Sequence, residues 1–304
     1  MAVVVLGSIN LDLIAKVAQV PRPGETALAE SLSMSPGGKG ANQALAARRM
    51  GAETVMLGMV GEDAFAMQAL KFLRQDGVDL SHIGVTREAS TGLALISVEA
   101  SGQNAITVAP GANAAIGADV LEALAHLLKP KDWLLLQCEI PLDVVERAIR
   151  IAKGVKARVM LDPAPAEARL PRSFFQVDVM TPNQIEAETL IGHPVTDVRS
   201  AKAAARQLRS RGVEVAVVKL GDQGVVWATG HGLFYLPGEP VAAIDAVGAG
   251  DAFQGALAAR LAAGDGLAEA IRWANHAAAL STTRHGAQPS YPYWEEVWNT
   301  FSPA

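Results

Sequence analysis

The stretch Asp245-Ala246-Val247-Gly248-Ala249-Gly250-Asp251 leads into a helix-forming segment, Asp251–Ala263. Glycines at 248 and 250 expose backbone N–H groups at the positive end of a helix, an arrangement that suits a phosphoryl group in transfer. Asp251, just inside the helix, is placed to accept a proton from a hydroxyl nucleophile. Aspartate is also a common residue at helix starts, but the two glycines and the second acid, Asp245, favour a functional site.

Outside this stretch, short apolar segments alternate with longer segments of helical periodicity. The apolar segments are typical of a parallel sheet covered on both faces, and they are Val3–Gly7, Thr54–Val60, Leu93–Val98, Trp133–Cys138, Arg158–Leu161, Val177–Met180, Val215–Leu220 and Val225–Ala228. The helical segments, many of which stop at a glycine, are Ala41–Met50, Ala64–Gln75, Ala118–Leu128, Leu142–Lys153, Ser200–Arg211, Asp251–Ala263 and Leu267–Thr283. This alternation predicts an α/β layered sandwich.

Two stretches, Leu11–Ser35 and Thr91–Val108, do not fit a strand-then-helix unit. The first contains Pro21, Pro23 and Gly24, and the second reads as two strands joined by the turn dipeptide Ser101-Gly102. Both are suited to a small antiparallel sheet beside the main one, such as a lid. No linker, low-complexity tract or internal repeat indicates a second independent domain.

The chain has 304 residues and a formal net charge of −5, from 26 Lys and Arg against 31 Asp and Glu. Half of the residues are apolar, which excludes a disordered chain. The acidic balance argues against broad nucleic-acid binding, because a phosphate backbone is held by clustered Lys and Arg. Residues 100–118 carry no charge, but their Gly, Asn, Gln and Pro exclude a membrane span.

The chain begins with a strand-like segment that has no basic flank or cleavage site, so we do not expect a signal peptide. The one cysteine, Cys138, excludes an internal disulfide and a Cys-rich zinc site. Its apolar neighbours in sequence indicate a small buried side chain rather than a nucleophile. Together these features predict a reducing, cytoplasmic location.

A second glycine-rich segment, Gly37-Gly38-Lys39-Gly40-Ala41-Asn42, directly precedes a predicted helix. Adjacent glycines allow the backbone to approach a ligand closely, and Lys39 adds a positive charge. The segment is not a Walker A loop, because Gly40 stands where Ser or Thr follows the Gly-Lys pair. A simple helix-initiating turn explains the pattern equally well.

Acids and amides follow several predicted strands. Asn183 and Glu186, three residues apart, are suited to holding a hydrated Mg²⁺, although an ordinary capping box has the same spacing. Asp12 and Glu139 each follow a strand, where a carboxylate can accept hydrogen bonds from neighbouring sugar hydroxyls. Each acid alone is more typical of a solvated loop, but their joint placement at strand ends favours a site.

These segments together resemble the ribokinase branch of the PfkB carbohydrate kinase family. Residues 37–42 are similar to the family's first signature, and residues 245–251 are similar to its second, the catalytic D-x-x-G-A-G-D segment. Further segments follow in the family's order, namely Pro163-Ala164-Pro165, Asn183–Glu186, Gly221–Gly224 and Gly286-Ala287-Gln288-Pro289-Ser290. The resemblance extends from Val5 to Ser290.

The resemblance implies one domain, residues 1–304, folded as a three-layer α/β/α sandwich with a mostly parallel central sheet. Segments 11–35 and 91–108 would form a small β-sheet lid, and two copies would pair through their lids as a homodimer. The implied reaction is ATP-dependent phosphorylation of D-ribose at its 5-hydroxyl, giving D-ribose 5-phosphate and ADP. Mg²⁺ would accompany ATP, and K⁺ would act as a monovalent activator.

The family's functional residues carry over to matching positions. Asp251 matches the general base, and the anion hole is matched by Gly248, Ala249 and Gly250. The implied sugar-binding positions are Asn10, Asp12, Gly38, Lys39, Asn42, Glu139 and Asp251. The implied ATP-binding positions are Asn183, Lys219, Gly221, Gly224, Gly250 and Asn275, with Glu186 as the acid associated with Mg²⁺. The implied positions for the monovalent cation are Asp245, Val247, Ser281, Arg284, Gly286 and Ser290.

Three positions depart from the family's pattern. Asp162 replaces the commoner Asn before Pro-Ala-Pro, Lys219 stands where Thr or Ser is frequent, and His285 takes a position often held by Lys. None of them belongs to the implied sugar set. We therefore expect these departures to affect nucleotide binding more than the choice of sugar.

Three alternative functions stay open. A kinase of another sugar, such as deoxyribose, or of a nucleoside would have the same fold. A non-catalytic sugar-binding sensor would be favoured by loss of Asp251 or the paired glycines, but both are present. A Rossmann dehydrogenase would carry GxGxxG after the first strand, where Gly7-Ser8-Ile9-Asn10 stands instead.

Overall fold

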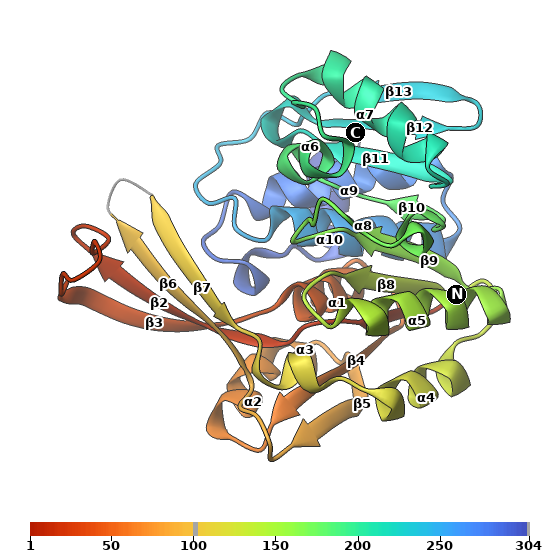
Figure 1. Ribbon diagram of the computed structural model, residues 1–304. Coiled ribbons are helices and arrows are strands. Elements are labelled where there is room, and N and C mark those ends of the chain that lie inside the picture. The colour runs from red at the N-terminus through yellow and green to blue at the C-terminus, as the bar shows by residue number, and fades with distance from the viewer. Residues whose placement is uncertain (100–102, 303–304) are drawn as a thin grey trace.

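The computed structural model describes residues 1–99 and 103–302. Within these ranges the main sheet has the strand order β13-β12-β11-β10-β9-β8-β1-β4-β5 (Figure 1). The seven strands from β5 to β11 in this order are parallel, and β12 and β13 are antiparallel additions at one edge. The strand bounds are β1 Val3–Leu6, β4 Thr54–Gly61, β5 Asp79–Thr86, β8 Trp133–Gln137, β9 Arg158–Asp162, β10 Val179–Met180, β11 Val215–Lys219, β12 Val225–Thr229 and β13 Gly232–Leu236.

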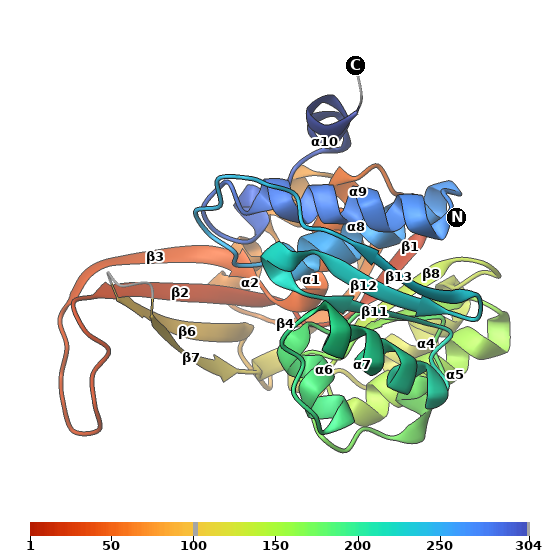
Figure 2. The ribbon, with the colours of Figure 1, turned by 90° about the horizontal axis from the view of Figure 1, so that it is seen from above.

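Helices cover both faces of this sheet (Figure 2). The α-helices of the described chain are α1 Lys39–Arg49, α2 Ala64–Ala69, α3 Lys71–Gln75, α4 Ala118–Leu127, α5 Leu142–Val155, α6 Gln184–Ile191, α7 Val198–Ser210, α8 Ala249–Ala263, α9 Leu267–Ser281 and α10 Trp294–Phe301, of which α10 packs on α9 rather than on the sheet. Alternate residues of β1 enter different cores: Val3 and Val5 pack with α1, α8 and α9, whereas Val4 and Leu6 pack with α4 and α5. The expected three-layer α/β/α sandwich is therefore confirmed.

A four-stranded sheet, called the small sheet below, projects from one side of the molecule (Figure 1). It has the order β3-β2-β6-β7, formed by β2 Asn10–Val17, β3 Ala29–Gly37, β6 Gly92–Glu99 and β7 Asn104–Ala109. Its outer pairs are antiparallel, as the sequence predicts, but the central pair β2 and β6 is parallel. The turn expected at Ser101-Gly102 lies outside the described residues.

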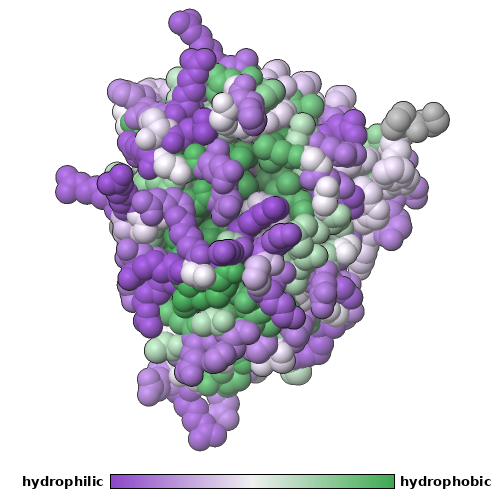
Figure 3. All heavy atoms as spheres, turned by 90° about the vertical axis from the view of Figure 1, so that its right-hand side faces the viewer, coloured by the Kyte–Doolittle hydropathy of each residue, from purple (hydrophilic) through white to green (hydrophobic). Residues whose placement is uncertain are grey.

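The carboxyl ends of the parallel strands face the small sheet, because β1 leads through Gly7, Ser8 and Ile9 directly into β2. The opposite side of the molecule carries projecting hydrophilic side chains with apolar areas between them (Figure 3). Ligands of open α/β sheets bind at the carboxyl ends of the strands. The end beside the small sheet is therefore where a site is expected.

Some elements differ from the sequence expectations. The predicted helix Ala64–Gln75 is two helices, α2 and α3, because the buried Leu70 between them has φ −90° and ψ 3° rather than helical values. The strands β5 and β13 and the helix α10 were not predicted, and α6 was foreseen only as the helix that a capping box at Asn183 and Glu186 would start. Both unpredicted strands lie at edges of the main sheet, where half-exposed residues leave no continuous apolar run.

The helices α1 and α8 approach each other closely at Gly255. A Cβ added there would lie 2.5 Å from the Ala46 side chain and 2.6 Å from the Ala47 backbone nitrogen. A real Cβ does not fit beside backbone at that distance. Glycine at 255 therefore allows α8, which carries Asp251, to lie against α1.

We predict that Gly255→Ala destabilises the fold by about 1–3 kcal/mol, the usual cost of overpacking. Gly154→Ala in α5 is the matched control, because nothing lies within 4 Å of a Cβ added there. The control exchange should stabilise the protein by about 0.5–1 kcal/mol. Urea unfolding of the two variants and the wild type measures the difference, and equal midpoints would contradict the close helix contact.

Candidate active site

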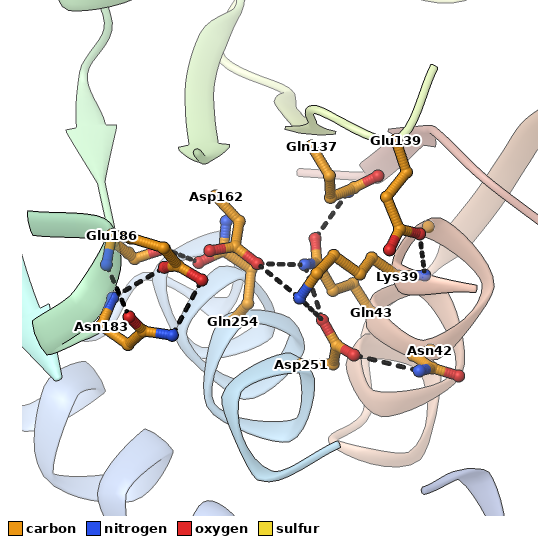
Figure 4. A network of polar contacts seen from close by, with 12 residues as sticks. Lys39, Asn42, Gln43, Gln137, Glu139, Asp162, Asn183, Glu186, Asp251 and Gln254 are labelled. Atoms are coloured by element: carbon orange, nitrogen blue, oxygen red, sulfur yellow. Dashed lines mark hydrogen bonds and ion pairs between the residues drawn. The ribbon is translucent and has the colours of Figure 1, made fainter. Parts of the chain in front are cut away.

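Polar side chains from neighbouring strands meet at the carboxyl edge of the main sheet. Gln137, Asp162 and Lys219 are the last residues of β8, β9 and β11. Gln137 pairs with Asp162 in the register, and Asn183 forms a parallel bridge with Lys219. Figure 4 shows Gln137, Asp162 and Asn183 together with side chains from the starts of α1 and α8.

The start of α1 is fixed by the acid Glu139. Its Oε2 accepts hydrogen bonds from the Ser8 hydroxyl at 2.6 Å and from the Lys39 backbone N–H at 3.1 Å. Gly38 precedes the helix with φ 87°, and an added Cβ would lie 2.7 Å from the Asn10 nitrogen. The first glycine-rich segment therefore starts a helix, as the simple alternative predicted, and also places Lys39 at the sheet edge.

The start of α8, where the sequence predicts an anion hole, is a helix N-terminus capped by glycine. Gly248 is the N-cap, with φ 76°, and the Tyr291 hydroxyl and Ala287 occupy the space that a Cβ would need. The first N–H groups of a helix have no partner within it. The N–H of Ala249 donates to the Ala246 carbonyl at 3.2 Å, so the N–H groups that follow it are better placed to receive an anion.

Asp251 lies at the centre of the site and is 5% exposed. One carboxylate oxygen accepts from the Asn42 side-chain amide and the other from the Gln43 side-chain amide, both at 3.0 Å. The Lys39 ammonium lies 4.0 Å from the second oxygen. These contacts orient the carboxylate between α1 and α8 (Figure 4).

Gln43 belongs to the site but was not predicted. Its amide also donates to Asp162 at 3.2 Å and accepts from Gln137 at 2.6 Å. It is fully buried on α1, beside the alanines of that helix and Leu45. A polar residue on the buried face of an apolar helix, directly after Asn42, is the signal that could have identified it.

Asp162 is the acid that links the two lysines of the site. It is 1% exposed, and its oxygens lie 3.7 Å from the Lys39 ammonium and 3.4 Å from the Lys219 ammonium. Burial alone lowers the pKa of Lys39, but the carboxylates of Asp251 and Asp162 outweigh it, and the net shift is upward. Lys39 is therefore a permanent positive charge.

The expected sugar-binding acid Asp12 lies over Gly37, whose added Cβ would be 2.4 Å from both carboxylate oxygens. Burial, together with the nearby charges of Glu139 and Asp251, raises the pKa of Asp12 to about 7. Asn10 is another expected sugar-binding residue, and its side-chain oxygen accepts a hydrogen bond from the Asn113 amide at 2.7 Å. Asn113 was not among the predicted site residues. The structure thus brings Asp12, Glu139 and Asp251 into one electrostatic group.

The expected nucleotide residues lie along the same edge. Asn183 and Glu186 form a capping box at the start of α6, which is the ordinary alternative that the sequence left open. Burial and the charge of Asp162 raise the pKa of Glu186. Gly221 and Gly224 form the turn between β11 and β12. Asn275 lies on α9, and its amide donates to the Pro237 carbonyl at 3.2 Å.

The positions expected for a monovalent cation come from two segments that lie side by side. Asp245 accepts from the N–H groups of Val247 at 3.0 Å and Gly286 at 2.8 Å. The hydroxyls of Ser281 and Ser290 each donate to a backbone carbonyl, and the Arg284 guanidinium pairs with Glu296. Arg284 therefore faces the cation positions only with its backbone.

The donor chemistry fits both cations without a protein cage. Asp245 and the hydroxyl and carbonyl oxygens around it are hard ligands that suit K⁺, and the Glu186 carboxylate suits Mg²⁺. Among residues 1–99 and 103–302, no group of three or more His, Cys, Asp or Glu is arranged to hold a metal. Mg²⁺ commonly takes one or two carboxylates and substrate phosphates, so this finding is compatible with a nucleotide-borne ion.

Two further observations concern Cys138 and the length of the helices. Burial raises the pKa of Cys138 to about 12, so its thiol is not an activated nucleophile. No helix in the described part of the chain has the length and apolarity needed to span a bilayer.

Comparison with known proteins places this geometry in a family. The model of the pfkB family carbohydrate kinases matches residues 2–294. Ribokinase of Haemophilus influenzae is 38% identical over 293 residues, which are 96% of each protein. Deoxyribokinase of Salmonella typhi is 36% identical over 297 residues, which are 97% of each protein.

Among solved structures, that of Arabidopsis thaliana ribokinase complexed with ribose and ATP has a TM-score of 0.91 to this chain. It is 29% identical, with 100% of this chain and 99% of that chain covered. Ribokinase of Thermotoga maritima has a TM-score of 0.88 at 33% identity, with 99% of each chain covered. The chain belongs to the PfkB family of carbohydrate kinases.

Proposed function

We propose that the protein phosphorylates D-ribose at its 5-hydroxyl with ATP, giving D-ribose 5-phosphate and ADP. The observation that carries this proposal is Asp251, a buried carboxylate held by two amides beside Lys39 at the N-terminus of α8. A base, a cation and helix N–H groups at one point are what phosphoryl transfer to a hydroxyl requires. Relatives named ribokinase support the choice of sugar.

In this mechanism each residue has a defined task. Asp251 accepts the proton of the 5-hydroxyl as that oxygen attacks the γ-phosphorus. The N–H groups at residues 248–250, with that of Ala249 released from the Ala246 carbonyl, and the Lys39 ammonium stabilise the negative charge of the transferring group. Asp12, Asn42 and Glu139 accept or donate hydrogen bonds to the other hydroxyls of the sugar, with Asn10 and the backbone at Gly38 beside them.

Two cations belong to the proposal. Mg²⁺ would be held by the ATP phosphates and Glu186 and would supply charge neutralisation on the phosphates. K⁺ would be held at Asp245 and the carbonyls around residues 247 and 281–290, next to the anion hole. The chain's own residues Asp245 and Gly286 are already joined by a hydrogen bond, which keeps the two segments of that site together.

The small sheet is proposed to act as a lid. The lid and the main sheet would form one domain, residues 1–304, and the enzyme would be cytoplasmic. Asp12 lies on β2, so closure of the small sheet over the sugar would complete the site and exclude water. Successive strand residues point to opposite faces. Leu13 and its register partners Met34 and Leu95 therefore lie on the face turned away from Asp12.

That outer face is proposed to bind the same face of a second copy. Leu32, Met34 and Leu95 are 68%, 52% and 49% exposed, and an apolar row of this kind on a projecting sheet is typical of an interface. Because the contact is with an identical surface, it would close as a symmetric dimer. The sugar face would then stay free to open and close.

The proposed reaction predicts sugar-dependent ADP release from ATP and Mg²⁺, faster with K⁺ than with Na⁺. D-ribose and 2-deoxy-D-ribose are the sugars to compare, because curated relatives carry either activity. Asp251→Asn should lower kcat by about 10²–10⁴-fold with little change in sugar affinity, since only the base is lost. Near-normal turnover by this variant would refute Asp251 as the base.

The raised pKa of Asp12 predicts a pH-dependent sugar affinity. The charged Asp12 carboxylate would accept hydrogen bonds from two sugar hydroxyls. Without sugar, Asp12 takes up a proton as the pH falls through about 7. The dissociation constant for the sugar should therefore rise about tenfold from pH 8 to pH 6, since one pH unit below a pKa leaves about a tenth of the group charged. Asp12→Asn should bind weakly with no such dependence. Calorimetric titration without nucleotide measures both, and a flat profile for the wild type would exclude Asp12 as a charged sugar ligand.

The proposed dimer predicts that Leu95→Asp gives a monomer in sedimentation velocity, because a charge would be buried at the interface. Met67→Asp is the control: Met67 is 68% exposed on α2, outside the small sheet, and its variant should keep the wild-type mass. A wild type that sediments as a monomer at all concentrations would rule out this dimer.

A further inference from the structure

The proposed mechanism leaves one charged group at the sheet edge without a task. Lys219 ends β11, and its side chain is 13% exposed. The resemblance places Lys219 among the implied ATP-binding positions but assigns its ammonium no contact with a part of the nucleotide. A nearly buried ammonium group is costly unless it has partners, and the partner that it has here is Asp162, at 3.4 Å.

The Lys219 ammonium lies beside the anion hole. A Cβ added to Gly250 would meet this nitrogen at 3.4 Å and nothing else within 4 Å. The charge of Lys219 also acts on Glu186, and the backbone of Lys219 forms a parallel bridge with Asn183. Lys219 is thus near both the residues proposed to bind Mg²⁺ and the residues proposed to bind the transferring phosphoryl group.

Asp162 holds two ammonium groups in position at once. Its Oδ1 faces Lys219 and its Oδ2 faces Lys39, at 3.4 Å and 3.7 Å, while Gln43 donates to Oδ2. Strong charge-assisted hydrogen bonds are about 2.7–2.9 Å long. These longer contacts orient both lysines, yet each ammonium keeps N–H groups for a stronger acceptor such as a phosphate oxygen.

We propose that Lys219 is a second phosphate-binding cation, which shares Asp162 with Lys39 beside the start of α8, and that Asp162 holds both lysines until the polyphosphate chain of a nucleoside triphosphate binds. This inference rests on the proposed function and deepens it. The two departures from the family's pattern at 162 and 219 then form one unit, because the acid neutralises the added lysine when no phosphate is present.

The test compares ligands with and without phosphates in calorimetric titrations that contain no sugar. Lys219→Met should weaken ATP and ADP by about tenfold or more, as expected for a lost charge-assisted contact, and leave adenosine within twofold. Lys153→Met, on the exposed side of α5, is the matched control and should leave all three affinities unchanged. Equal losses for ATP and adenosine, or no loss, would overturn the proposal.

A purely structural role for Lys219, neutralising Asp162, is separated by repeating the exchange in an Asp162→Asn background. In that background residue 162 is an uncharged amide, which needs no cation to neutralise it. A phosphate contact predicts that Lys219→Met still weakens ATP by about tenfold, whereas neutralisation alone predicts no further loss. The second result would overturn the proposal even if the single variant folds poorly.

Sugar-dependent ADP release by the wild type separates this inference from the proposed function. If the wild type phosphorylates a sugar while Lys219→Met binds ATP normally, only the Lys219 proposal fails. If the wild type phosphorylates no sugar, but Lys219→Met binds ATP more weakly than the wild type and adenosine equally well, the Lys219 proposal stands and the proposed reaction fails.

Discussion

The close contact of α8 with α1 at Gly255 is the constraint on which the site depends. Backbone atoms of α1 occupy the space that a side chain at position 255 would need. Because of this close approach, Asp251 on α8 accepts hydrogen bonds from Asn42 and Gln43 on α1. A wider helix separation would leave a buried carboxylate without donors, which is costly. The absence of a side chain at Gly255 therefore allows the helix contact in which Asn42 and Gln43 orient Asp251.

The parallel sheet concentrates negative charge at one edge, because its strands all end there. The acids at that edge are Asp12, Glu139, Asp162, Glu186 and Asp251. Burial, and after it their mutual repulsion, raises the pKa of Asp12 and of Glu186, while Lys39 and Lys219 offset part of the charge. The net charge of −5 thus says little about nucleotide binding, since helix N–H groups and two lysines face the place where phosphates would lie.

Several parts of the fold and the site were predictable because their signals are local. Nearly continuous apolar runs indicated the inner strands, such as Trp133–Gln137, and the glycines at 248 and 250 indicated the start of α8. The edge strands β5 and β13 carry no such run, since one side of an edge strand is half exposed. The parallel pairing of β2 with β6 was also missed, because a strand's own sequence does not record which neighbour it pairs with or in which direction.

The sequence by itself determined the alternation of strands and helices, the presence of a helix after each glycine-rich segment, and the set of residues that resemble a carbohydrate kinase. These properties depend on backbone conformation and side-chain periodicity over a few residues. Only the tertiary structure decided that Gln43 contacts Asp251, which is 208 positions away in the chain. It also decided that Lys219 contacts Asp162, 57 positions away, and that Lys39 lies near the same acid. Such pairings follow from sheet order and helix packing, which bring distant chain segments together through burial rather than through any local pattern.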